Sequence, residues 1–289
     1  MTSLPADRPL NTLTGDEFRS LDRKAITLLG MSGVGKTTLC RKLPSCDWFH
    51  YSGDFRLGTR YMDEAILDNI KREAMKVPFL ADLLRRDAIY ICHNITTTNL
   101  SPVSTFLGKI GDPARGGIGI DEFMRRQALH MEAEYKAMLD VEAFIDKAFD
   151  VYGYRHFVND AGGSLCELDD PALFEMLARR TLIIYLEAPA DMLDELVERA
   201  MKDPKPLYYR PDFLTTRLDE YLRERALSSV NEIEPDDFMR WIFPQLIESR
   251  LPRYDAIARR YGIRIDAGKI QNLKSEADVL DLIAAALDR

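Results

Sequence analysis

The sequence has few cysteines, and their spacing matches no common metal or redox motif. Only four cysteines occur in 289 residues, Cys40, Cys46, Cys92 and Cys166, and no two of them form a C-x-x-C pair. This excludes the usual zinc and dithiol signatures, and in a chain of this size it predicts reduced thiols in or near the core.

Basic residues are also in the minority, because the formal net charge is −8. Nucleic-acid backbones are held by surfaces rich in lysine and arginine. An acidic chain therefore makes nucleic acid an unlikely general partner, although a local basic cleft stays compatible with this composition.

Long apolar runs are missing as well. No stretch has the length needed to cross a membrane, and residues 1–18 lack the basic start and apolar core of a signal peptide. We therefore expect a cytoplasmic protein with no membrane partner. The sequence also has no internal repeat and no low-complexity tract.

Compact apolar runs alternate with helical patterns along the chain. The runs that predict strands lie at about residues 25–30, 47–54, 154–160, 181–188 and 262–267. This alternation predicts an α/β fold, a three-layer α/β/α P-loop NTPase architecture with a mostly parallel sheet, in one domain over residues 1–289. A loose arm is expected at the start, and Thr14 to Glu17 have the spacing of a capping box for a short helix before residue 23.

Two segments depart from this pattern. Residues 95–120 are rich in Thr, Ser, Gly and Pro, and we predict a long loop there, within a helical insertion over 95–150. The helix expected from Asp121 has an apolar stripe that predicts core packing. The stripe consists of Met124, Ala128, Met131, Tyr135 and Met138. Residues 200–214 are rich in proline and basic residues and predict a lid.

The stretch LLGMSGVGKTTLCRKL (28–43) carries the strongest motif. Gly30, Gly35, Lys36 and Thr37 match the phosphate-loop pattern G-x-x-x-x-G-K-[ST]. Glycines let several backbone N–H groups converge on one anion, and a helix starting at Lys36 points its positive end at the same place. The residues predicted to hold ATP are Gly30, Met31, Ser32, Gly33, Val34, Gly35, Lys36, Thr37 and Thr38.

Magnesium should accompany this nucleotide, with Thr37 and Asp160 as its protein ligands. Asp160 and Asp54 each end a predicted strand, and the carboxyl ends of parallel strands lie at one edge of a sheet. Asp54 is the candidate general base, or orienting carboxylate, for an acceptor hydroxyl. The alternative for either acid is a helix N-cap or a solvated turn. Residues 160–163 also fit the D-x-x-G of GTPase switches, but no N-K-x-D motif accompanies them.

Basic residues near these acids fit a second substrate and a closing lid. Arg56 and Arg60 follow Asp54 and suit the carboxylate or phosphate of an acceptor, unless they form surface salt bridges. We predict catalytic roles for Arg199, Lys205 and Arg210, which would close over the transferring phosphoryl group. The alternative for these three is a solvated charged face.

These motifs together resemble the P-loop small-molecule kinases, of the shikimate-kinase-like and nucleoside-monophosphate-kinase-like type. The phosphate loop GMSGVGKTT is similar to that of the family, and Asp54 falls where the family has its substrate-binding acid. The resemblance implies substrate contacts at Gly162, Gly163 and Arg250, and a lid with Arg199 and Lys205. The chain also resembles a group known only as bacterial P-loop ATPases.

Three functions stay open from the sequence. The first is an ATP-dependent kinase that phosphorylates a small, anionic acceptor. The second is a regulatory or switch ATPase that acts with a protein partner. The third is a toxin-like or polynucleotide kinase. The residues identify neither the acceptor nor the oligomeric state.

Overall fold

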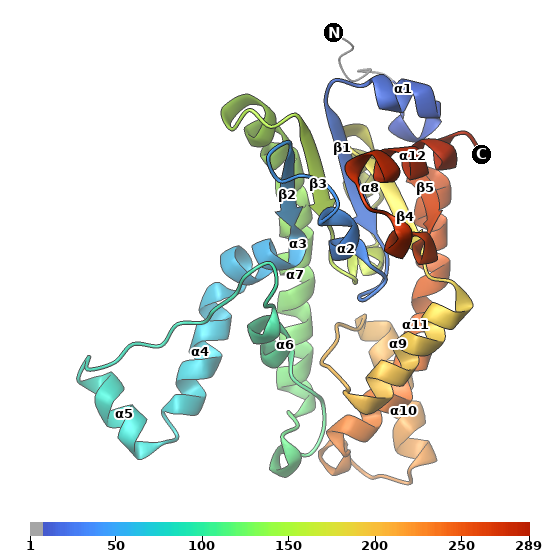
Figure 1. Ribbon diagram of the computed structural model, residues 1–289. Helices are drawn as coiled ribbons and strands as arrows, with labels where there is room; N and C mark the ends of the chain where they lie inside the picture. Colours follow the sequence, from blue (N-terminus) through green and yellow to red (C-terminus); the bar gives the residue numbers. More distant parts are fainter. Residues whose placement is uncertain (1–7) are drawn as a thin grey trace. The chain divides into compact units, whose positions relative to one another are not determined.

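The computed structural model describes residues 8–289, and its chain forms two compact units (Figure 1). Within the described residues, the sheet unit comprises 8–53, 138–202 and 243–289, and the helical unit comprises Asp54–Ala137 and Asp203–Ile242. Residues 1–7, the start of the predicted arm, lie outside the described part. The single domain predicted over 1–289 stays a prediction.

The sheet unit is built on five parallel strands. They are β1 Lys24–Leu29, β2 Trp48–Ser52, β3 His156–Asp160, β4 Leu182–Glu187 and β5 Gly262–Asp266. Their order is β2-β3-β1-β4-β5, and each neighbouring pair is parallel. The predicted α/β architecture with a parallel sheet is therefore confirmed, with a strand in each of the five apolar runs.

β1 is central because its sequence suits burial on both faces. All six residues of KAITLL are buried, as expected for a strand inside a parallel sheet. Its one hydroxyl is satisfied within the core: Thr27 Oγ1 lies 2.8 Å from Thr181 Oγ1 and accepts from Asn159 Nδ2 at 3.3 Å.

Helices cover the sheet on both faces. The helices that lie wholly in this unit are α1 Gly15–Ser20, α2 Lys36–Cys40, α8 Pro171–Arg180, α9 Ala190–Lys202 and α12 Glu276–Leu287. In the parallel sheet, right-handed crossovers place α2 and α12 on one face and α8 on the other (Figure 1). The Thr14–Glu17 capping box of α1 is confirmed. α2 ends at Cys40, three residues before the predicted end at Leu43.

The helical unit has no strand of the sheet among its described residues. Its own helices are α4 Asp63–Ala74, α5 Pro78–Arg85, α6 Ser101–Leu107 and α10 Pro211–Glu224. Two long helices, α7 Ile120–Asp146 and α11 Pro235–Tyr261, begin in this unit and end in the sheet unit. A short helix, α3 Gly53–Arg56, stands at the first junction.

The continuous loop predicted for 95–120 is wrong, because α6 lies inside it. Pro102 sits in the first turn of α6, where its fixed φ favours a helix and its missing N–H costs nothing. Val103, Phe106 and Leu107 then become buried on one side. The assignment of 95–150 as an insertion stays a prediction.

The apolar stripe predicted for α7 is wrong at Ala128 and Met131, whereas Met138 is buried as predicted. Ala128 and Met131 are exposed, whereas Gln127, His130 and Glu134 are buried. The buried face of α7 therefore combines apolar side chains, such as Phe123 and Val141, with polar side chains that need partners. Gln127, for example, accepts the Tyr209 N–H at 2.8 Å and donates to the Leu207 carbonyl at 3.2 Å.

The cysteines divide into two kinds. Cys40 and Cys166 are buried free thiols, but Cys46 and Cys92 are exposed, so the prediction of core or near-core positions is wrong for these two. Over residues 8–289, no helix is long and apolar enough to span a membrane.

We predict that stability falls between about pH 6.5 and pH 4 through His156 on β3. Burial, with Lys24 and Arg155 nearby, lowers the pKa of His156 from 6.5 to about 4. Its Nδ1 must stay unprotonated, because it accepts the Lys24 N–H at 3.1 Å. Between these two pH values the unfolded chain binds more protons than the folded chain, so acid favours unfolding.

Urea denaturation at a series of pH values measures this effect. His156→Gln has no ring to protonate, so its free energy of unfolding should fall less steeply over the same range. Equal slopes for the two proteins would show that His156 is not responsible.

Candidate functional site

The phosphate loop lies between β1 and α2 and has the backbone that its glycines predict. Gly30 has φ +148°, and a side chain there would come 2.9 Å from the Leu186 carbonyl oxygen of β4. Gly35, at the N-cap of α2, has φ +101°. The side chains of Met31 and Val34 are buried and anchor the loop, whereas Ser32, Gly33, Thr37 and Thr38 are exposed. Two buried side chains therefore anchor the loop in the protein interior, while its polar residues are exposed to solvent.

Lys36 lies across this loop and is buried. Its Nζ donates to the Gly30 carbonyl at 2.6 Å and to the Met31 carbonyl at 2.9 Å. The ammonium is thus fixed at the rim of the loop, where a phosphate group would offer it stronger charge-assisted hydrogen bonds than two carbonyls do.

Thr37 and Asp160 meet at the carboxyl edge of the sheet. Thr37 Oγ1 donates to Asp160 Oδ2 at 2.7 Å. The contact follows from strand register, since Asp160 ends β3 opposite Leu28 of β1, two residues before Gly30. A hydroxyl and a carboxylate at this distance are the hard oxygen donors that Mg²⁺ prefers, so the pair fits the predicted ion.

A glycine turn follows β3 and packs against the phosphate loop. A side chain at Gly163 would come 2.9 Å from the Ser32 backbone nitrogen. Only glycine therefore fits between the turn and the loop. Gly162 and Gly163, predicted to contact substrate, are placed beside the phosphate loop, and the substrate contact itself stays a prediction.

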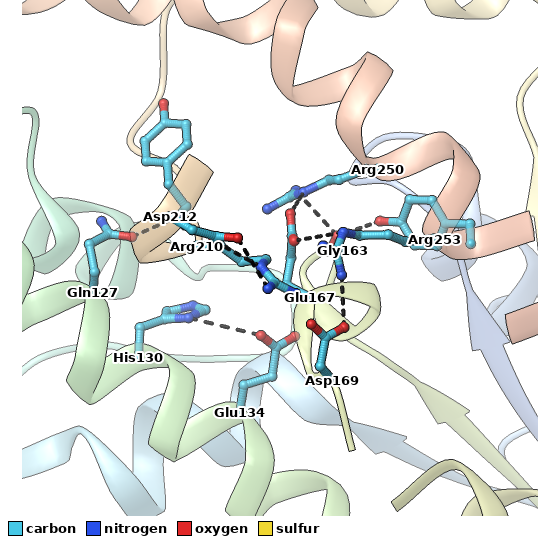
Figure 2. Close-up of polar contacts among 12 residues, drawn as sticks. Gln127, His130, Glu134, Gly163, Glu167, Asp169, Arg210, Asp212, Arg250 and Arg253 are labelled. Atoms are coloured by element: carbon cyan, nitrogen blue, oxygen red, sulfur yellow. Dashed lines mark hydrogen bonds and ion pairs between the residues drawn. The ribbon is translucent and has the colours of Figure 1, made fainter. Parts of the chain in front are cut away.

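Arg250 of α11 holds this turn in place (Figure 2). Its Nε donates to Glu167 Oε1 at 2.7 Å and its Nη1 to the Gly163 carbonyl at 3.3 Å. Tyr254, one turn further along α11, donates its hydroxyl to the same carbonyl. The side chains of Arg250 and Glu167 are only 5% and 2% exposed.

Arg250 stays charged despite this burial. Burial works against the charged form, but Tyr254, Cys166 and Glu167 outweigh it and raise the pKa of Arg250 above its usual range. The predicted contact of Arg250 with a substrate stays a prediction. What the structure shows is an arginine that fixes the Gly163 carbonyl, in a group that we call the clamp, formed by Glu167, Arg250 and Tyr254.

Arg199 of α9 lies next to the loop. Its guanidinium nitrogens come within 3.5 and 3.8 Å of the position that a side chain at Gly33 would occupy. Of the three basic residues predicted to close over the phosphoryl group, Arg199 alone belongs to the sheet unit, together with the phosphate loop. Its role in phosphoryl transfer stays a prediction.

The other predicted site residues belong to the helical unit. Asp54 is in the first turn of α3, Arg56 lies 5.7 Å from the Tyr61 ring, and Arg60 is exposed on a short π-helix, Leu57–Tyr61. Lys205 is exposed and lies 3.6 Å from Asp203, and Arg210 pairs with Asp212 at 3.1 Å (Figure 2). The predicted roles of Asp54, Arg56 and Arg60 at the acceptor, and of Lys205 and Arg210 over the transferring phosphoryl group, stay predictions.

The proline-rich segment of the predicted lid is anchored within the helical unit. Tyr208 and Tyr209 are buried, and Tyr208 stacks on His130 with ring centroids 5.4 Å apart. Gln127 binds the backbone on both sides of Tyr208. In this structure the two tyrosines therefore serve as anchors of the segment, and the lid over 200–214 stays a prediction.

Sequence reasoning missed Glu167, Tyr254 and Gln127. The spacing of Arg250 and Tyr254, four residues apart on one helix face, was a usable signal for a shared partner. Nothing local marks Glu167, because its partner is 83 residues away. Gln127 lies next to Ala128, where the predicted apolar stripe is wrong.

No protein-family model matches the chain, and no curated protein matches it. Among solved structures, the chain is similar to the shikimate kinase from Bacteroides thetaiotaomicron, with 16% sequence identity. The likeness covers 78% of this chain and 98% of that chain, with a TM-score of 0.28. We draw nothing about the site from a likeness of this size.

We predict that the buried pair Glu167–Arg250 is strongly coupled. Glu167→Leu leaves a buried guanidinium without its carboxylate and should cost about 3–5 kcal/mol of unfolding free energy. The double variant Glu167→Leu/Arg250→Met removes both charges and should cost less than either single change. Urea denaturation of the four proteins measures this cycle, and single losses that simply add would show that the pair is uncoupled.

Proposed function

We propose that the chain binds ATP with Mg²⁺ at the phosphate loop and transfers the γ-phosphoryl group to a small, anionic acceptor. The observation that carries this proposal is the arrangement of Lys36, Thr37 and Asp160. A fixed ammonium and a hydroxyl–carboxylate pair 2.7 Å apart stand at the carboxyl edge of a parallel sheet, where such folds bind ligands. A cytoplasmic location and the absence of a nucleic-acid partner belong to the same proposal.

In this proposal, each group at the phosphate loop has a separate role in binding ATP or in phosphoryl transfer. Backbone N–H groups of residues 30–38 cradle the phosphates, and Lys36 neutralises the outer ones. Thr37 and Asp160 would hold the ion. Bound Mg²⁺ would stabilise the negative charge that develops on the phosphates during transfer. Arg199, beside Gly33, supplies positive charge where charge develops during transfer.

The acceptor would be bound by Asp54, Arg56 and Arg60. Asp54 would orient the acceptor hydroxyl and take its proton late in the transfer. Arg56 and Arg60 would bind the acceptor's anionic group. Lys205 and Arg210 would exclude water as a lid. Because the clamp already engages Arg250, we assign Arg250 the shaping of the Gly162–Gly163 turn, which faces the phosphate loop.

Lys36→Ala should weaken ATP binding by about 10- to 100-fold, because charge-assisted hydrogen bonds to phosphate are lost. Titration calorimetry with MgATP measures this loss, with Lys42→Ala as the matched control just beyond α2. Unchanged affinity in a folded Lys36→Ala protein would remove the nucleotide site from the proposal.

Asp160→Asn should lower turnover by about 100-fold while changing ATP affinity only several-fold, since its charge acts mainly on the metal during transfer. Steady-state kinetics at saturating MgATP separates the two effects. Glu187→Gln, an exposed acid at the carboxyl end of β4, is the control. If the asparagine variant turns over normally, Asp160 is not the magnesium ligand.

A metabolite panel assayed for ATP consumption decides between transfer and hydrolysis. The proposal expects slow hydrolysis alone and a strong rise with the right acceptor. Arg56→Ala should then raise the acceptor KM about tenfold at unchanged ATP affinity, and Arg72→Ala should not. Fast hydrolysis without an acceptor, altered by a protein partner only, would replace the kinase with a regulatory ATPase.

A further inference from the structure

The helical unit contains a pocket that the proposed ATP chemistry does not use. It has a volume of about 240 Å³ and is lined by α4, α6 and the extended segment that carries His93. Ile66, Ile70 and Phe106 supply apolar walls, and Ser101 and Thr105 supply hydroxyl groups. An apolar cavity of about 150 Å³ already accepts benzene, so a single-ring molecule fits this volume.

His93 is the polar group that gives this pocket its chemistry. The side chain is only 9% exposed, and its Nε2 lies 2.5 Å from Asp63 Oδ1. Its Nδ1 is buried and has no hydrogen-bond partner among residues 8–289. A buried ring nitrogen without a partner costs free energy, and a ligand that pairs with it would recover that cost.

Asp63 sets which nitrogen carries the proton. A carboxylate accepts only, so Nε2 must be the N–H that donates to it, and the neutral ring then presents a lone pair at Nδ1. A ligand at this nitrogen must therefore donate a hydrogen bond. This excludes ethers and ketones as good partners and favours a hydroxyl group.

Arg126, a buried cation that is bonded to the pocket residues Asn69 and Phe106, is already engaged, which argues for a neutral ligand. Arg126 donates from Nε to Glu122 at 2.7 Å, from Nη2 to Asn69 at 2.7 Å, and from Nη1 to the Phe106 carbonyl at 2.5 Å. With its guanidinium shared among these three oxygens, Arg126 offers little to an anion in the pocket. Apart from His93 and the amide of Asn69, the lining residues are apolar or carry hydroxyl groups, and none of them is charged.

We propose that this pocket binds a small, neutral molecule with an apolar body and one hydroxyl group, which donates to His93 Nδ1. The site is independent of the phosphate loop and of the proposed transfer. The pocket should select ligands that carry a hydrogen-bond donor on a single ring. The hydroxyl groups of Ser101 and Thr105 can donate to the ligand's hydroxyl oxygen.

Phenol and anisole test this rule, because they share a ring and differ in the donor. The full chain is labelled with ¹⁵N-histidine, and the His93 signal is assigned by its loss in His93→Phe. Phenol should shift the His93 Nδ1 resonance saturably and bind about tenfold or more tightly than anisole. Equal binding of the two, or no shift with phenol, would overturn the proposal.

Two variants keep the test independent of simple packing. His93→Phe keeps an aromatic ring without the acceptor and should lose the preference for phenol over anisole. Asp63→Asn can donate to Nε2, which moves the ring proton to Nδ1, so its preference for phenol should also disappear. Circular dichroism confirms that each variant folds, and a retained phenol preference in either folded variant would refute the role of His93.

Discussion

The site depends on the register in which β3 lies beside β1. Parallel pairing sets Asp160 opposite Leu28, so the acid at the end of β3 stands next to the start of the phosphate loop. A shift by one residue would turn every side chain of β3 to the other face, moving Asp160 away from Thr37. The buried hydrogen bond from Asn159 of β3 to Thr27 of β1 opposes such a shift, because the Asn159 side chain would lose this partner.

Beyond that register, the surface of the site is fixed by polar ties from a distant helix. Glu167 and Arg250 are buried as a pair, and the Gly163 carbonyl accepts from both Arg250 and Tyr254. These bonds keep the turn so close to Ser32 that only glycine fits at position 163. Apolar packing alone would fill this space without dictating where one carbonyl points. The clamp therefore controls orientation, which matters most where a ligand is held by backbone groups.

The sequence was sufficient wherever the signal was local. Continuous apolar runs identified each strand, and the glycine spacing in 30–37 identified the phosphate loop. It failed where a partner is remote. Gln127 on α7 is buried because a backbone segment 80 residues away satisfies it, and no periodicity of apolar residues reveals such a face. Residues 95–120 were misjudged because Pro102 resembles a breaker although it begins a helix. Both errors come from tertiary partners or position-dependent chemistry that a pattern does not encode.

The packing of α1 on α12 has a consequence for how the chain is made. The Gly15 N–H donates to Asp288 at 2.7 Å across 273 residues, and Arg19 pairs with Asp281 at 3.0 Å. The strands that pair with β1 are also synthesised long after it, since Lys24 of β1 and its partner His156 of β3 are 132 residues apart. At a synthesis rate of about 5–20 residues per second, β1 waits roughly 7–26 s for β3 to be made. For that time an apolar strand has both edges unpaired, so the nascent chain is prone to edge-to-edge aggregation and suited to chaperone binding.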